Sequence, residues 1–372
     1  MKLLGKIFRG LLVLLVLVVV VGAFMLSNTS DCGPLRTAAL NSVVADVPLM
    51  TAVRTPCYGS PDDMLLAEFE KPVAGDDEVL VNVKAASVNP LDWHYLRGLP
   101  YFMRLMSGLN KPDDLRSGVD FAGVVEAIGK NVSQFKVGDR VFGGRSGAFG
   151  EYLVIPEDRA ITHIPDNVSF EEAAAVPIAG VTAIQALRDL GQIKAGYKVL
   201  VNGASGGVGT YAVQIAKSFG AEVTGVSSQK NHAMVKALGA DHMIDYKSSN
   251  YTENGEKYDI IIDNIGNHSF GANTKVLTPD GKLVMIGGAK GDWIGPMINP
   301  IKALFTAPFV DQEFIMIMAE MRADDLGVIA GLMGEGKVRS QIDRQYSLKE
   351  VPEAIRYSES GRARGKIIIN MQ

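Results

Sequence analysis

The segment that decides the fold is KVLVNGASGGVGTYAVQIAKSFGAEVTGV, residues 198–226. A β-branched run ends at Asn202, and a glycine-rich turn, residues 203–209, follows it. Apolar residues then recur at helical spacing over 208–219, before a second β-branched run. A strand, a glycine turn, a helix and a second strand form the unit that binds a dinucleotide, because glycines let the backbone approach a pyrophosphate at the helix N-terminus. Ala204 stands at the first position of the GxGxxG pattern, but the flanking strand and helix still predict a binding turn.

Composition limits the classes of function. The chain has 372 residues, which is long enough for two domains, and 21% of them are charged. A net charge of −4 without a basic stripe argues against a nucleic-acid partner. The two cysteines, Cys32 and Cys57, are too few for a disulfide framework or a cysteine-rich zinc site. Both are therefore predicted to be incidental thiols.

The N-terminus is strongly apolar. Residues 10–30 carry no charge, and residues 11–26 are almost wholly Leu, Val, Phe, Met and Ala. This run is just long enough to cross a bilayer as a helix. Three basic residues precede it, which also fits a secretory signal peptide, but no small-x-small cleavage site follows. We predict an uncleaved transmembrane anchor over residues 1–30, with a cleaved signal as the alternative, so the lipid bilayer through residues 10–30 is an expected partner.

The side of the membrane stays open at this point. The positive-inside rule places the N-terminus in the cytoplasm and the body of the protein outside it. A nicotinamide dinucleotide, however, is mainly a cytoplasmic resource. Residues 31–50 follow as a linker with little periodicity.

Two patterns divide the rest of the chain. Residues 51–175 are rich in strands, among them 79–85, 118–128 and 137–142, and a helical run over 171–190 ends this part. Strands and helices then alternate over 176–305, which predicts a parallel sheet with helices on both faces. Residues 306–372 are expected to return to the first domain through a final strand, 366–370. The strands of the middle region are expected at 199–201, 222–226, 242–244, 258–262 and 282–286, and its helices near 207–219, 230–238 and 268–277.

These segments together resemble the medium-chain dehydrogenase/reductase superfamily, and within it the zinc-independent quinone oxidoreductase branch. The matching blocks run in order from about residue 50 to 372 and include AASVNPLDWHYLRG (85–98), GVDFAGVVEAIGKNV (118–132), VLVNGASGGVGTYAVQIAK (199–217) and GRARGKIII (361–369). The resemblance implies an α/β fold, with a GroES-like β-barrel domain and a doubly wound Rossmann sheet. One transmembrane helix is expected before them, and the active site is expected in the cleft between the two domains.

Zinc is not expected. The zinc-dependent branch places a catalytic Cys where this chain has Asn89, and a Gly-His-Glu motif soon after. This chain lacks that His, and two cysteines cannot build the tetrahedral Cys/His sites of the family.

The expected cofactor is NADPH rather than NADH. An NAD-specific Rossmann fold places a carboxylate at the end of the second strand, where this chain has Ser227, Ser228, Gln229 and Lys230. The Lys230 charge suits a 2′-phosphate, although a solvated lysine is the plainer alternative. By resemblance, the cofactor-binding residues are Asn89, Thr182, Ser205, Gly206, Gly207, Val208, Ser228, Lys230, Tyr246, Asn264, Ile265, Gly287, Gly288, Arg364 and Lys366.

Without zinc, the plausible chemistry is hydride transfer to a carbon that is already electrophilic, as in a quinone or an α,β-unsaturated carbonyl. Candidate hydrogen-bond or proton donors are His94, Tyr95 and Tyr101. Packing is the alternative for His94, and Asp92 is expected to cap or pair locally. Apolar segments at 99–109 and 294–321 either shape a lipophilic substrate site or form core and a homodimer interface. A membrane-attached NADPH-binding interaction protein with little or no turnover remains the alternative function.

Overall fold

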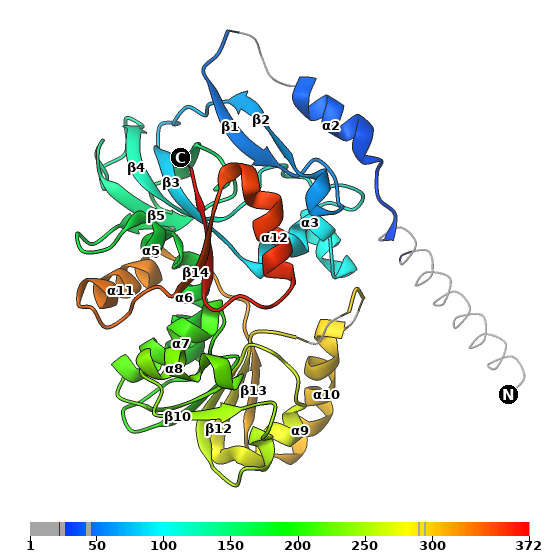
Figure 1. Cartoon of the computed structure of the whole chain (residues 1–372), viewed down its shortest axis with the longest axis vertical. Helices are drawn as coiled ribbons and strands as arrows, with labels where there is room; N and C mark the ends of the chain where they lie inside the picture. Colours follow the sequence, from blue (N-terminus) through cyan, green and yellow to red (C-terminus); the bar gives the residue numbers. More distant parts are fainter. Residues whose placement is uncertain (1–21, 23–26, 42–45, 289–290, 294, 372) are drawn as a thin grey trace, which may run out of the picture.

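Two large sheets organise the molecule (Figure 1). The computed structural model describes Gly22 and residues 27–41, 46–288, 291–293 and 295–371. One sheet has seven strands in the order β14-β15-β3-β4-β5-β7, with β6 paired to β3. A two-stranded sheet, β1-β2, lies beside it at the top of Figure 1. These strands are β1 (Leu49–Arg54), β2 (Leu65–Glu70), β3 (Glu78–Val88), β4 (Asp120–Ile128), β5 (Arg140–Gly144), β6 (Tyr152–Pro156), β7 (Ile161–His163), β14 (Ile342–Ser347) and β15 (Lys366–Asn370).

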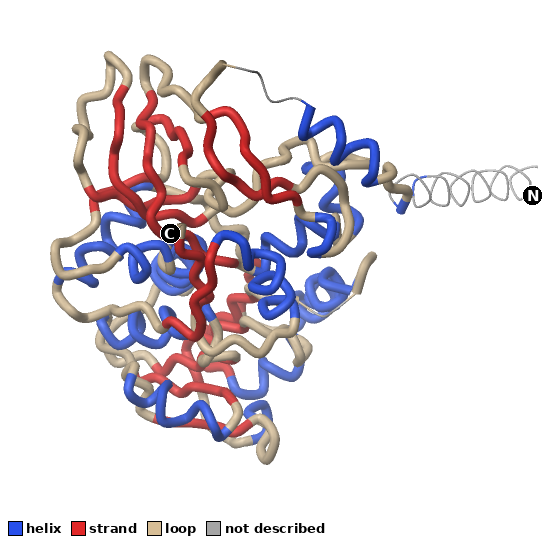
Figure 2. The backbone as a smooth tube through the Cα atoms, turned by 45° about the horizontal axis from the view of Figure 1, so that its top comes forward, coloured by secondary structure: helices blue, strands red, loops and turns tan. Residues whose placement is uncertain are grey.

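The second sheet is the Rossmann sheet, with six parallel strands in the order β10-β9-β8-β11-β12-β13. Its central strands are buried on both faces, as the continuous apolar runs at 199–201 and 260–262 require. Helices flank this sheet in the lower half of Figure 2. The strands are β8 (Lys198–Asn202), β9 (Glu222–Ser227), β10 (His242–Asp245), β11 (Tyr258–Asp263), β12 (Leu277–Met285) and β13 (Glu313–Met316). The strand β13 lies beyond the boundary predicted at residue 305.

The helices connect and cover these sheets. They are α2 (Cys32–Asn41), α3 (Pro90–Arg97), α4 (Arg104–Ser107), α5 (Phe170–Ala174), α6 (Pro177–Ile184), α7 (Gly207–Ser218), α8 (His232–Ala237), α9 (Phe270–Asn273), α10 (Ile298–Thr306), α11 (Ala323–Gly334) and α12 (Val351–Glu359). The helical run predicted as one unit at 171–190 is broken into α5, α6 and a π-helical turn, Gln185–Leu190. Pro177, which has no backbone N–H, starts α6 rather than continuing α5.

The last strand joins the first domain. Strand β15 pairs antiparallel with β3 and parallel with β14, so a segment from the C-terminus completes the sheet that begins at residue 78. This crossing also brings Gly365 beside the glycine turn, where it forms a bridge with Gly206. The two domains are therefore tied together at the position where a dinucleotide would bind.

The N-terminal region differs from the sequence prediction in two ways. The predicted linker contains helix α2, and the prediction of incidental thiols is wrong, because Cys32 and Cys57 form a disulfide (Cα–Cα 5.4 Å). Cys32 begins α2 and Cys57 is fully buried after β1, and their sequence separation of 25 hid the pairing from any local pattern. The anchor predicted at 10–30 falls mostly outside the described residues. Within the described part, no helix is long and apolar enough to cross a bilayer.

Candidate functional site

The glycine turn is shaped for close contact with an anion. Gly203 has φ +78°, and a Cβ on it would lie 2.9 Å from Ile265 Cδ1. A Cβ on Gly209 would lie 2.2 Å from the Gly203 carbonyl oxygen, so only glycine lets α7 pack this closely on the turn. Gly206 is the N-cap of α7 and has no side chain to cap the first amides of this 12-residue helix. The amide of Gly206 donates to the Gly203 carbonyl oxygen (3.1 Å), so Ser205, Gly207 and Val208 present the uncapped N–H groups at the positive end of the helix dipole.

The carboxyl end of β11 forms the opposite rim. The Asp263 carboxylate accepts hydrogen bonds from Asn202 Nδ2 and from the amides of Ile265 and Gly266. Asn264 Nδ2 donates to the Asn202 carbonyl oxygen (2.9 Å), while Asn264 Oδ1 is buried without a partner among the described residues. An unpaired buried acceptor at the carboxyl edge of a parallel sheet fits a ligand that donates a hydrogen bond there.

Two glycines after β12 complete this rim. A Cβ on Gly287 would lie 2.0 Å from the Asn264 carbonyl oxygen, so the backbone of Gly287 rests directly on the end of β11. A Cβ on Gly288 would lie 3.0 Å from Pro296 Cα. Ile265 is about half exposed beside the turn. The sequence-predicted residues of both rims are thus brought together around one edge of the Rossmann sheet.

Two cavities lie at the expected adenosine end. One, of about 320 Å³, includes Asn202, Val226 and the half-exposed Tyr246 in its lining. The other, of about 610 Å³, is lined by Lys230, Arg344, Arg356, Tyr357, Ser360, Arg362 and Arg364. Five cationic side chains thus surround the second cavity. Ser228 is buried directly after the end of β9. Asn231 Nδ2 donates to Ser205 Oγ (3.0 Å), which links this segment to the glycine turn.

A buried polar centre lies where the zinc-dependent branch would place its metal. Lys366 Nζ donates to Asn89 Oδ1 (2.5 Å) and lies 3.3 Å from Asp120 Oδ2. Lys366 is 3% exposed and Asp120 is fully buried. The Lys366 stem lies against Gly207, since a Cβ there would be 3.3 Å from Lys366 Cδ. Lys366 therefore joins the glycine turn to the first domain through its buried ammonium group.

Asp120 organises this centre. Its carboxylate accepts hydrogen bonds from Ser87 Oγ, Asn89 Nδ2 and the amide of Ile178. Both ends of the Asn89 amide are therefore used, and the side chain is held in one orientation. Thr182, one turn along α6 from Ile178, is buried and donates its hydroxyl to the Ile178 carbonyl oxygen (2.7 Å).

Asp92 forms a capping box at the start of α3. Its Oδ2 accepts from the amide of Asn89 (2.7 Å). Burial raises the pKa of Asp92 to about 7, and the nearby charge of Asp120 acts in the same direction, against the hydrogen bond from Asn89 and the charge of Lys366. This is the local capping role that the sequence predicts for Asp92.

The three predicted donors lie on and after α3. His94 is half-buried and its Nδ1 lies 2.7 Å from the Leu99 carbonyl oxygen. A carbonyl oxygen only accepts, so Nδ1 carries the proton and Nε2 is the acceptor of the neutral ring. Burial lowers the pKa of His94, although the hydrogen bond with Leu99 opposes the shift. Tyr95 is 44% exposed on α3.

Tyr101 lies where the two domains meet. Its amide donates to the Asp292 carbonyl oxygen (2.8 Å), and its ring packs on Trp293 with 4.5 Å between centroids. The Arg104 guanidinium lies 4.8 Å from the centre of the Tyr101 ring. Tyr101 therefore contacts both domains.

Sequence reasoning missed the partners of these residues. Asp120 lies in the block at 118–132 but carries no local signal of its role, because its contacts come from positions 31 to 246 residues away in the chain. The sequence likewise gives no local signal that Trp293 packs on Tyr101. Among the described residues, the group of possible metal ligands is Cys32, Cys57 and Asp63, and its two sulfurs are already joined in the disulfide.

Comparisons with known proteins agree with this architecture. The family described as an alcohol dehydrogenase GroES-like domain matches residues 75–166, and the family described as a zinc-binding dehydrogenase matches residues 238–369. The chloroplast envelope quinone oxidoreductase homolog of Arabidopsis thaliana is 33% identical over 313 residues, which are 80% of this chain and 91% of that protein. The 2-methylene-furan-3-one reductase of Solanum lycopersicum is 31% identical over 368 residues, 92% of this chain and 87% of that protein.

A solved structure agrees as well. The quinone oxidoreductase from Coxiella burnetii superposes with a TM-score of 0.76 at 28% identity, over 87% of this chain and 100% of that one. With relatives above 30% identity matched over most of its length, the chain belongs to the medium-chain dehydrogenase/reductase superfamily, in its quinone oxidoreductase-like branch.

Proposed function

We propose that this protein is a zinc-independent oxidoreductase that transfers hydride from NADPH to a quinone or an α,β-unsaturated carbonyl. The observation that carries the proposal is the meeting of an uncapped glycine turn, the unpaired Asn264 Oδ1 and the Asn89 centre at the junction of the two domains. The names of the relatives, a quinone oxidoreductase homolog and an enone reductase, point to the same class of acceptor.

The residues present fit a bound NADPH. The uncapped amides of the glycine turn would hold its pyrophosphate, and Asn264 Oδ1 would accept a hydrogen bond from its ribose. Lys230 and Arg364, which line the basic cavity, would face the 2′-phosphate. The cofactor supplies the hydride when it is bound, and the protein supplies orientation, a dry cleft and a hydrogen-bond donor.

The polar centre supports chemistry without zinc. Its side chains are an ammonium, an amide and a carboxylate, rather than the thiolates and imidazoles that Zn²⁺ prefers. The Lys366 ammonium also places a positive charge beside Asn89, where a second cation would be repelled.

We assign the donor role to Tyr101 rather than to His94. The neutral His94 ring uses its single N–H on Leu99, so it has no proton left to give to an acceptor oxygen. Tyr101 contacts both domains and carries a hydroxyl donor. Because general acid catalysis contributes about 10²–10⁴-fold, we expect Tyr101→Phe to lower kcat by about 10² and His94→Gln by far less. The opposite order would assign the role to His94.

We also propose that residues 10–30 anchor the protein in a bilayer, with the body outside the cytoplasm. The basic residues before the apolar run favour this orientation, and the Cys32–Cys57 disulfide is typical of oxidising compartments. Labelling of the thiols of the reduced protein from either side of sealed vesicles would decide the orientation. Access only from the cytoplasmic side would contradict it.

The central test uses the full chain in detergent micelles. We expect NADPH oxidation with quinones and enones, weaker oxidation of NADH, and no stoichiometric zinc by elemental analysis. Binding of NADPH without turnover of any acceptor would contradict the enzyme assignment and favour an interaction protein. One zinc ion per chain would contradict the zinc-independent mechanism.

A further inference from the structure

The segment after α3 buries its charged side chain and exposes large apolar ones. Residues 101–109 form a short 3₁₀ turn and α4, and their charged residue, Arg104, is 3% exposed. Its neighbours Leu105 and Met106 are 69% and 80% exposed, and Phe102 and Leu109 are each more than 40% exposed. Soluble surfaces show the opposite order, with charges outward and large apolar side chains inward. We call these four apolar side chains the 102–109 patch.

The inversion is built into the packing around Arg104. Its Nε donates to the Gly98 carbonyl oxygen (2.8 Å), and its guanidinium lies over the Tyr58 ring (4.5 Å). Gly98 has φ +59°, and a Cβ there would lie 2.6 Å from Arg104 Nε. Arg104 is therefore fixed inward, and the turn leaves its apolar neighbours exposed.

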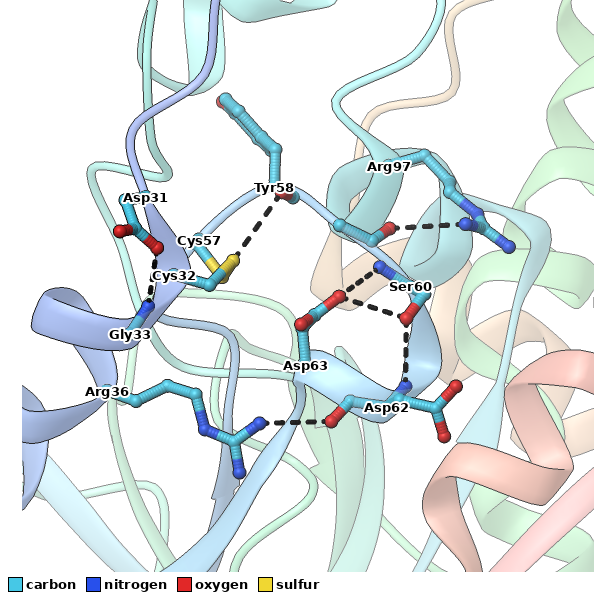
Figure 3. Close-up of a disulfide and its surroundings, with 11 residues drawn as sticks. Asp31, Cys32, Gly33, Arg36, Cys57, Tyr58, Ser60, Asp62, Asp63 and Arg97 are labelled. Atoms are coloured by element: carbon cyan, nitrogen blue, oxygen red, sulfur yellow. Dashed lines mark hydrogen bonds between the residues drawn. A yellow bond between two sulfur atoms is a disulfide. The ribbon is translucent and has the colours of Figure 1, made fainter.

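The N-terminal segment is attached at the same place. Arg104 Nη1 donates to the Asn28 carbonyl oxygen (3.3 Å), and the Ser30 amide donates to the Asn110 carbonyl oxygen (3.0 Å). Two residues further on, Cys32 is bonded to Cys57, and Arg36 Nη1 donates to the Asp62 carbonyl oxygen (Figure 3). The disulfide and these hydrogen bonds hold residues 28–36 on the first domain, beside the 102–109 patch.

The apolar N-terminal run directly precedes this attachment in the sequence. The uncharged run of residues 11–26 ends one residue before Ser27, and two residues span at most about 7 Å. If this run lies in a bilayer, the bilayer surface lies within that distance of Asn28. The exposed patch beside Asn28 is then at the level of the interface, where buried apolar side chains strengthen membrane binding.

We propose that the 102–109 patch is a membrane-docking surface that holds the junction of the two domains against the lipid bilayer. The proposal rests on the anchor suggested above. The patch follows Tyr101, which joins the two domains through Asp292 and Trp293, so docking places the junction of the domains beside the acyl chains. A lipophilic acceptor would then enter from the bilayer rather than from water.

The test places a fluorescent probe on the patch of the full-length protein. Met106→Trp adds an emitter at the patch, and Val137→Trp adds one at a similarly exposed position (62%) between β4 and β5. In Figure 1 these two strands lie on the side of the first domain away from α2. Each variant is reconstituted into phosphatidylcholine vesicles with or without brominated acyl chains. The emission of wild-type protein, which has two tryptophans, is subtracted.

We expect the protein to float with the vesicles and Met106→Trp to lose most of its added emission to brominated lipid, while Val137→Trp loses none. Flotation without quenching at position 106 would overturn the docking surface and leave the anchor standing. Failure to float would overturn both. Equal quenching at the two positions, or a patch tryptophan already shielded in detergent by a second copy of the chain, would also overturn the docking surface.

Discussion

The buried pair of Lys366 and Asp120 gives a sharp test of how the two domains are held together. We consider Lys366→Met, which keeps the length of the side chain but removes its charge. Both partners are at least 97% buried, so solvent does not screen the pair. Breaking a buried pair by removing one partner typically costs about 3–5 kcal/mol, because the other charge stays behind. Asp120 keeps its hydrogen bonds from Ser87, Asn89 and Ile178, which places the expected loss near the lower end, at about 3 kcal/mol.

The assay is the free energy of unfolding in urea, followed by circular dichroism. Lys282→Met is the matched control, because Lys282 pairs with Glu313, which is largely exposed, at 3.8 Å. Such a pair is worth at most about 1 kcal/mol. The double variant Lys366→Met, Asp120→Asn should recover much of the loss, since no buried charge remains. A Lys366→Met loss no larger than that of Lys282→Met, or a double variant no more stable than Lys366→Met, would refute this reasoning.

Three further predictions follow from single residues. The pKa of Asp92 is about 7 in the folded protein, against about 3.9 in the unfolded chain. Between these two values the native state binds more protons than the unfolded state. The free energy of unfolding therefore falls by up to about 4 kcal/mol as the pH rises through this window. Asp92→Asn should remove this loss of stability, measured as the difference between the urea midpoints at pH 5 and pH 8. The same difference in wild-type protein and variant would contradict the assignment to Asp92. Lys230→Ala should lower kcat/KM for NADPH by about 10–100-fold and leave NADH unaffected, whereas Lys236→Ala on α8 should change neither. Replacing both Cys32 and Cys57 by serine should lower the free energy of unfolding by about 3 kcal/mol, because the disulfide closes a loop with a sequence separation of 25. We expect faster hydrogen exchange in α2 of this variant, and unchanged exchange there would contradict the prediction.

Local patterns predicted much of the fold. The strands at 199–201, 222–226 and 258–262 lie within β8, β9 and β11, and the helix at 207–219 matches α7 within one residue. These elements have strong periodicity and clear glycine signals, so residues close in sequence suffice to define them. The predicted single helix at 171–190 failed because Pro177 interrupts the backbone hydrogen bonds there.

The site was predicted only in part. The residues of the glycine turn and of the ends of β11 and β12 do gather at one edge of the sheet, because the carboxyl ends of parallel strands share an edge. The contacts that each side chain makes could not be predicted from the sequence. Lys366, predicted from the family resemblance as a cofactor-binding residue, is buried against Asn89 and Asp120, which lie 277 and 246 residues away in the chain.

The sequence by itself determined the class of fold and the position of the glycine turn, because each depends on residue types within a short window. Only the tertiary structure decided which charges are buried, which cysteines meet and which apolar side chains stay outside. The inward Arg104 and the outward Met106 differ by two positions in the chain, and neither period nor composition separates them. The burial of Arg104 is set by its contacts with Tyr58, Gly98 and Asn28, which the fold brings together around its guanidinium group.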